Sequence, residues 1–391
     1  MKIEKTIIGF AFALAACGNE GLDFSEQNLR AVGFGSYTEQ FTTRGEVKGA
    51  IPDSTSIGIY AYYHDDSNWA ADAAASRITP NFMWNQQAAF YLKINAFVYS
   101  PLKYWPNEET DKLSFIAYYP FTDPDISDNP ANPVHPESTD STGLTPLLHN
   151  DNNGLPSFNF TVKDTQKYQT DLLVSELITN LPQTRDTESD PGLPFNDLTI
   201  YDKVKFRFHH ALSKIEFRVV ADADIRKDIV SFHLYDLGIS NIYKDGTLTT
   251  AYDALEGTSY TWSGQTNRHG TNPAYNYPCT TYVPYLLMPQ TLRADAMLSL
   301  DYEITLKSDG TTYHYVGTTP VADQDYTYRN TASIQLNTMK LTGSGDALTE
   351  WLPNHHYIYT IRLRANRIEF TGEVVDWGEE LTPPALELSE E

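Results

Sequence analysis

Apolar and polar residues alternate over many short stretches of the chain, which is the pattern of β-strands. In residues 55–62, Ile57 and Ile59 fall on one face, and Tyr60 and Tyr62 on the other. Further stretches of strand character lie at residues 97–105, 113–119, 158–162, 171–177, 204–208, 215–219, 229–237, 259–262, 282–288, 296–307 and 312–316. No long stretch repeats apolar residues at helical spacing. The pattern predicts an all-β fold with few or no long helices.

The clearest hairpin lies at residues 357–377, where two alternating stretches flank a turn at residues 365–367. Elsewhere the alternation changes phase: apolar residues stand at even positions in 204–208 and at odd positions in 215–219. A slip of one residue turns every side chain to the other face, so a bulge or short turn must lie near His209 and His210. Neighbouring residues of a strand point to opposite faces, so neither this pair nor His355 and His356 is expected to bind one metal ion.

Two polar stretches rich in Pro, Asp and Thr interrupt the strands, at residues 121–156 and 181–202. We interpret the first as a long surface excursion and the second as a linker. The acidic run at 123–129 lacks the Gly and the closing Glu of a calcium loop, which favours a solvated loop over a metal site. The predicted domains are residues 45–181 and 204–377, joined by a linker at 182–203 and followed by an acidic tail at 378–391.

Composition supports the all-β prediction and limits the kinds of partner that the chain can bind. The 391 residues include 26 Tyr, 18 Phe and 6 Trp, and aromatic residues favour strands. The formal net charge of −23 opposes binding to nucleic acid and to anionic lipid headgroups. There are only two cysteines, so a disulfide framework is excluded if one of them is modified.

The first 44 residues carry export signals. Lys2 and Lys5 precede an apolar run at residues 7–14, and small residues lead directly into Cys17. This is a lipobox: residues 1–16 are interpreted as a signal peptide, and Cys17 as the acylated first residue of a lipoprotein. The alternatives are a plain secretory signal with an incidental cysteine and a retained membrane anchor, although the run is well short of the about 20 residues that span a bilayer.

No motif of an enzyme is present. The chain lacks a P-loop, a dinucleotide-binding glycine pattern, a zincin helix, a nucleophile-elbow serine and paired CxxC motifs. Abundant carboxylates alone do not define a hydrolase. We therefore expect no catalytic residue, no cofactor and no metal. The alternative function is a surface lipoprotein that binds glycans, in which Trp69, Trp84 or Trp262 would stack on sugar rings from an exposed platform.

A set of short motifs, in order along the chain, resembles the fimbrillin family of type V pilus subunits. The set comprises the lipobox at Cys17, VGF at 32–34 with TR at 43–44, YWP at 104–106 with LSFIAYYP at 113–120, TDLL at 170–173, FRFHHALSKI at 206–215, LMPQ at 287–290, and WLPNHHYIY at 351–359 leading to VVDW at 374–377. Each motif is short, but together they span nearly the whole chain.

The resemblance implies two tandem transthyretin-like β-sandwich domains of Greek-key type and a lipid anchor in the outer membrane before maturation. It also implies cleavage by a trypsin-like or Arg-specific protease, for which Arg44 and Gly45 are the matching residues. Cleavage would remove residues 17–44, including a first strand marked by Val32, Phe34, Tyr37 and Phe41. A strand from the next subunit would then fill the groove. The implied partners are other fimbrial subunits, in a homo- or hetero-polymer at the cell surface, with a host or bacterial receptor as a further possibility.

Two features depart from this pattern. The tail after Trp377 is short and contains Pro383 and Pro384, which cannot donate to a strand ladder. Arg30 is a competing cleavage site before the expected first strand.

Overall fold

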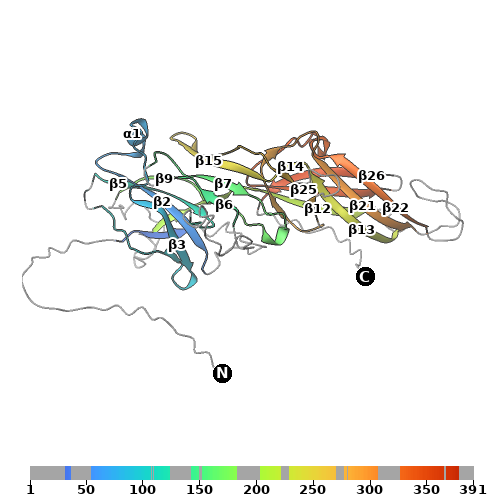
Figure 1. The fold of residues 1–391 in the computed structure, drawn as a ribbon, viewed down its shortest axis with the longest axis horizontal. Helices are drawn as coiled ribbons and strands as arrows, with labels where there is room; N and C mark the ends of the chain where they lie inside the picture. Colours follow the sequence, from blue (N-terminus) through green and yellow to red (C-terminus); the bar gives the residue numbers. More distant parts are fainter. Residues whose placement is uncertain are drawn as a thin grey trace, which may run out of the picture.

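The computed structural model describes residues 31–36, 54–106, 108, 110–123, 142–148, 152–182, 203–221, 229–269, 277–279, 281–306, 326–364 and 367–377. These residues form an elongated molecule with two lobes. Strands from the first half of the chain lie mainly in one lobe and the last strands in the other (Figure 1). The fold is all-β, as the sequence predicts. In the described part of the chain, the strands are accompanied by one short α-helix, α1 (Trp69–Ala74), and three 3₁₀ turns, η1 (Leu92–Ile94), η2 (Gln166–Tyr168) and η3 (Leu336–Thr338).

The first lobe is built on a nine-stranded sheet, here called sheet I. Its order is β10 (Lys203–Phe206), β1 (Gly33–Ser36), β4 (Ala96–Val98), β3 (Met83–Tyr91), β2 (Ser56–His64), β5 (Lys112–Tyr119), β8 (Leu173–Ser175) and β11 (Phe208–His210), and β9 (Ile178–Pro182) also pairs with β5. The two ends of this order, β10 and β11, are consecutive in the chain and separated only by Arg207. Sheet I therefore curls until its ends meet, as in a barrel.

The side chains that point into this curl form a compact aromatic core. It contains Phe34, Ile59, Phe97, Phe115 and Phe206 among its fully or nearly fully buried members. Alternation explains this set, because every second residue of a strand faces the same side. The alternate residues of β2 and β5, among them Tyr60 and Tyr118, face outward and are also buried, since a second sheet covers them.

That covering layer, sheet II, has the order β16 (Gly257–Ser263), β15 (Asp245–Asp253), β7 (Ser157–Thr161) and β6 (Leu144–Pro146). Two parts of the chain that the sequence assigns to the second domain thus lie in the first lobe: β10 and β11 in sheet I, and β15 and β16 in sheet II. The division into domains at residues 182–203 stays a prediction, and these pairings mean that the two lobes share chain segments.

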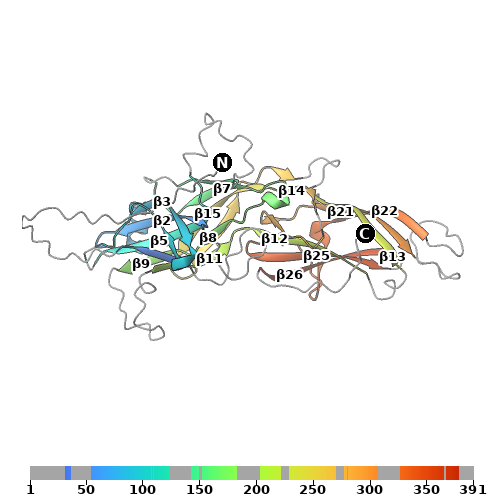
Figure 2. The ribbon, with the colours of Figure 1, turned by 90° about the horizontal axis from the view of Figure 1, so that it is seen from below.

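The second lobe packs two sheets face to face, and Figure 2 separates the layers. Sheet III has the order β19 (Tyr285–Leu287), β12 (Ser213–Ala221), β25 (His355–Arg364), β26 (Arg367–Asp376) and β23 (Lys340–Leu341). Sheet IV has the order β18 (Tyr277–Pro278), β13 (Ile229–Ser240), β21 (Met297–Leu306) and β22 (Tyr326–Gln335). Two short pairs, β14 (Ile242–Tyr243) with β17 (Arg268–His269) and β20 (Gln290–Thr291) with β24 (Glu350–Trp351), complete the described strands.

The predicted phase change near His209 and His210 arises because the chain passes from one sheet to another, and not from a bulge within one strand. Strand β11 belongs to sheet I and β12 to sheet III, so the chain changes sheets at Ala211 and Leu212. His210 stays at the junction, where its Nδ1 lies 2.6 Å from Asp171 Oδ2 and its ring stacks on Trp377 at 4.0 Å between centroids. His209 contacts Glu176 instead, with Nε2 2.9 Å from Oε1. The two histidines thus have different partners.

Several strand boundaries differ from the predicted ones. The expected stretch 97–105 contains only β4, and 282–288 only β19. The predicted strand at 312–316 and the acidic run at 124–129 lie outside the described residues. Within the described parts of the chain, no helix is long and apolar enough to cross a membrane.

Candidate functional site around strand β1

Strand β1, only four residues long, occupies an internal position in sheet I. On one side it pairs in parallel with β10, in the register Gly33 to Lys203 through Ser36 to Phe206. On the other side it is antiparallel to β4, where Phe34 and Phe97 are partners. Because β1 has neighbours on both sides, its removal would leave a gap between β10 and β4, with one unpaired edge on each.

The side chain of Phe34 anchors β1 in the aromatic core. It is fully buried, and its ring stacks on Phe206 at 5.7 Å between centroids with an interplanar angle of 18°. It also contacts Tyr99 at 5.3 Å and meets Phe115 edge-on at 5.7 Å. These offset and edge-on geometries are the favourable ones for aromatic pairs. A strand of four residues therefore contributes a large apolar side chain to the centre of the core.

Hydrogen bonds between Val32, just before β1, and the segment after β4 also stabilise the position of β1. The Val32 amide donates to the Lys103 carbonyl oxygen at 2.9 Å, and the Tyr99 hydroxyl donates to the Val32 carbonyl oxygen at 2.9 Å. Val32 is itself buried. Of the residues that the sequence marks in this region, Phe34 lies in β1 and Val32 lies two residues before it, directly ahead of the strand. Cys17, Tyr37, Phe41, Arg44 and Gly45 lie outside the described residues.

The sequence predicts the strand at 204–208 but not its pairing with β1, because it places this strand in the second domain. It also gives no signal for the contacts of Tyr99. The alternation of Val204, Phe206 and Phe208 indicates a strand. Nothing local in it indicates a parallel pairing with a segment near the start of the chain.

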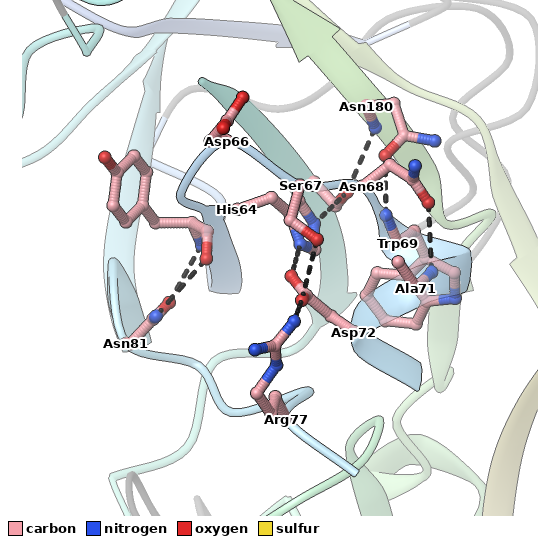
Figure 3. A network of polar contacts seen from close by, with 12 residues as sticks. His64, Asp66, Ser67, Asn68, Trp69, Ala71, Asp72, Arg77, Asn81 and Asn180 are labelled. Atoms are coloured by element: carbon pink, nitrogen blue, oxygen red, sulfur yellow. Dashed lines mark hydrogen bonds and ion pairs between the residues drawn. The ribbon is translucent and has the colours of Figure 1, made fainter. Parts of the chain in front are cut away.

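A second polar cluster lies at α1 and includes His64 and Asp72 (Figure 3). Together with Ser114 it has the composition of a catalytic triad. His64 Nδ1 lies 2.6 Å from Asp72 Oδ2, and His64 Nε2 lies 2.9 Å from Ser114 Oγ. All three side chains are buried, and Ser114 Oγ also accepts a hydrogen bond from the Asn180 amide at 3.0 Å. A nucleophile must reach its substrate, so a fully buried serine in this arrangement has a structural role.

The structural role is to fix α1 to sheet I. Asp72, in the helix, accepts hydrogen bonds from Ser67 Oγ at 2.9 Å and Arg77 Nη2 at 2.8 Å, while Asn68 caps the helix N-terminus. Burial raises the pKa of Asp72, but the hydrogen bonds from His64, Ser67 and Arg77 outweigh it, so the pKa lies below its usual value. The folded state therefore favours the ionised carboxylate.

Replacing Asp72 by asparagine is expected to lower the free energy of unfolding by about 2 kcal/mol at neutral pH, because a buried charged hydrogen-bond acceptor is lost. The stabilisation by the carboxylate is fully present above its unfolded-state pKa of about 3.9 and is lost as the pH falls through the lower folded-state pKa. Denaturant unfolding from pH 7 to 3 should thus show the two proteins converging in stability. Asp65→Asn, at an exposed position, is the control, and a difference independent of pH would contradict this account.

The tryptophans expected on a glycan platform are packed into the protein. Trp69 is buried, and Trp84 and Trp262 are half-buried against the large core that joins the lobes. Their indole N–H groups donate to main-chain oxygens, that of Trp84 to Leu148 and that of Trp262 to Ala211, both at 2.7 Å. None of the three forms an exposed platform, so the glycan alternative loses the feature that motivated it.

A cavity of about 410 Å³ opens near the junction of the lobes, and Glu176, His209, Tyr252, Tyr260 and Asn354 are among its lining residues. Among the described residues, the Tyr260 hydroxyl and Asn354 Oδ1 have no hydrogen-bond partner, but both atoms are shielded from solvent. Burial, and then the charge of Glu176, raise the pKa of Tyr260. These polar atoms are therefore not available to a ligand in this conformation.

The described residues thus form a two-lobed all-β architecture in which β1 is an internal strand of sheet I and the serine of the triad-like cluster is buried. The family model described as fimbrillin-like matches residues 43–377, and the chain belongs to this family. Membership makes the chain a fimbrial subunit of the cell surface and not an enzyme.

One solved structure with a TM-score above 0.5 supports the fold. A fimbrial protein from Bacteroides vulgatus ATCC 8482 is similar with a TM-score of 0.51 and 18% identity, over 89% of this chain and 99% of that one. A fimbrilin from Porphyromonas gingivalis W83 gives a TM-score of 0.33 and 10% identity, over 89% and 96% of the respective chains. No curated protein sequence matches the chain.

Proposed function

We propose that the chain is exported as a lipoprotein acylated at Cys17 and assembles into a fimbrium by replacement of β1. In this proposal a protease cuts after Arg44, the segment that contains β1 leaves sheet I, and a strand of the next subunit fills the gap between β10 and β4. The observation that carries the proposal is the internal place of β1, which has four residue pairs with β10 but only one with β4.

The energetics of the gap supply the driving force. Loss of β1 would uncover the apolar surface around Phe97, Tyr99 and Phe206 and leave main-chain groups of two strands unpaired. Both consequences are unfavourable in water, and an added strand reverses both at once. A new strand that offers one large apolar side chain at the position of Phe34 would restore the core.

The proposal predicts that Arg44→Ala abolishes assembly, whereas Arg30→Ala leaves it intact. A cut after Arg30 leaves β1 attached to the chain, but a cut after Arg44 separates it, so the two variants differ only in whether β1 can be released. The purified precursor and both variants are treated with a low dose of an Arg-specific protease, because trypsin would also cut after Lys48 and release β1 from Arg44→Ala. Intact mass spectrometry identifies the new N-terminus. Electron microscopy then scores the polymer.

The expected result is a chain beginning at Gly45 and fibres for the wild type and Arg30→Ala, with neither for Arg44→Ala. Fibres formed by Arg44→Ala at the wild-type level would overturn the proposal. A separate Cys17→Ala variant tests the lipid anchor and should no longer incorporate labelled fatty acid in cells. Labelling at the wild-type level would refute acylation at Cys17.

A further inference from the structure

The hairpin next to β1 exposes an unusual concentration of large apolar side chains. Leu92 and Ile94, at the η1 turn between β3 and β4, are 58% and 57% exposed. The hairpin patch is defined here as these two residues together with Tyr91, Val98, Leu102 and Tyr104, all of them exposed. In the rest of the described chain, exposed large apolar side chains occur at scattered positions, such as Leu255 and Val374. Single exposed apolar side chains are normal, but such a concentration of them in one short segment points to an interaction surface.

The charge of the same segment is opposite to that of the chain as a whole. Residues 73–107 contain Arg77, Lys93 and Lys103 and no Asp or Glu, in a protein with a formal net charge of −23. Lys93 lies between Leu92 and Ile94, and Lys103 lies between Leu102 and Tyr104. The hairpin patch is thus both apolar and locally cationic, which suits a partner that is apolar and acidic.

The hairpin patch also borders both ends of β1. The η1 turn immediately precedes β4, which runs antiparallel to β1, so the turn lies toward the end of β1 that leads to Arg44. At the other end, Ala31 pairs with Tyr104, and the Val32 amide donates to the Lys103 carbonyl oxygen. A subunit that approaches the β1 position must therefore come close to these side chains.

We infer that the hairpin patch is a docking surface for the acidic surface of a second copy of this chain, and that it acts without removal of β1. Two chains of the same strong negative charge repel one another, but at physiological salt this repulsion is screened over about 8 Å, so local charges decide where contact forms. The hairpin segment has no acidic residue, so it repels an acidic second copy least. Its exposed Tyr and Leu side chains supply apolar contact area. The choice of a second copy rests on the proposed fimbrial assembly.

The test uses the full, uncut chain, in which β1 remains in sheet I. Sedimentation velocity should reveal reversible self-association with a dissociation constant in the range of about 10–100 µM, typical of a weak interface. The paired substitution Leu92→Glu with Ile94→Glu should weaken it by about tenfold or more, because two apolar contacts are lost and charge of the wrong sign is added. Leu255→Glu, at a position 96% exposed elsewhere on the molecule, is the matched control and should leave it unchanged. High salt should weaken the wild-type interaction.

A strictly monomeric uncut chain would overturn the inference, as would equal effects of the hairpin and Leu255 substitutions. Pelleting of a monomeric chain with phosphatidylglycerol vesicles, lost on substitution of Leu92 and Ile94, would assign the hairpin patch to a lipid surface and likewise overturn it. Thermal melting checks the fold of each variant. If the double variant melts at a lower temperature than the wild type, the single variant Leu92→Ser is used in its place. Because β1 is in place throughout, self-association without later fibre formation would refute the proposed strand replacement and leave this inference standing.

Discussion

Replacing Phe34 by alanine should lower the free energy of unfolding of the uncut chain by about 3–5 kcal/mol. The substitution removes a fully buried ring that contacts Phe206, Tyr99 and Phe115, and the closed curl of sheet I leaves little room for its neighbours to fill the space. Urea unfolding followed by aromatic fluorescence measures the loss. Val98→Ala, on the neighbouring strand and 43% exposed, is the control and should change the value by no more than about 0.5 kcal/mol.

The effect of Phe34→Ala on stability should differ between the uncut chain and the assembled fibres. If β1 leaves sheet I on maturation, Phe34 no longer belongs to the folded subunit, and the stability of fibres grown from Phe34→Ala should match that of wild-type fibres. An uncut variant as stable as Val98→Ala would contradict the place of Phe34 in the core. Fibres weakened as strongly as the uncut chain would mean that β1 remains in the subunit.

Gly58→Ala is expected to destabilise the protein by about 3 kcal/mol through overpacking. A Cβ at Gly58 would overlap Tyr118 Cε1 and lie 2.8 Å from Asn85 Oδ1. Tyr118 cannot easily yield, because it is fully buried and its hydroxyl donates to Asn85 Oδ1 at 2.6 Å. Alanine therefore forces either the ring or strand β2 to move.

Gly372→Ala is the matched control for this prediction. Gly372 also lies within a strand, β26, but a Cβ there would meet Leu348 Cδ2 at 3.5 Å and Leu341 Cδ2 at 3.7 Å, which is ordinary contact. The free energy of unfolding of Gly372→Ala should stay within about 0.5 kcal/mol of the wild-type value. Thermal melting compares the two variants, and equal shifts would show that the contact between Gly58 and Tyr118 is not the cause.

The sequence predicts which side chains enter the core better than it predicts which strands are neighbours. Alternation places Ile57 and Ile59 on one face and Tyr60 and Tyr62 on the other, and the structure buries both sets in different cores. Alternation is a local property with a fixed period of two. The parallel pairing of β1 with β10 depends instead on how sheet I closes, which no local pattern encodes.

Local chemistry explains the elements that were not predicted. The sequence pattern does not predict strand β3, because polar residues at 85–87 interrupt its alternation, and Asn85 adopts a positive φ of 44° in the structure. Helix α1 is too short for a helical period, and its stability depends on the Asn68 cap and on Asp72, whose partners His64 and Arg77 are visible only in the folded chain. The fimbrillin resemblance, by contrast, came from motifs scattered along the chain, and the family match over residues 43–377 confirms it.

The most direct test of strand replacement follows the segment that ends at Arg44 through assembly. The precursor is labelled with heavy isotopes, cut with trypsin and allowed to polymerise, and the washed fibres are analysed by quantitative mass spectrometry for peptides that contain Val32 and Phe34. The account predicts that these peptides are absent from fibres and recovered in the soluble fraction. Fibres that retain them in a one-to-one ratio with the rest of the chain would contradict it.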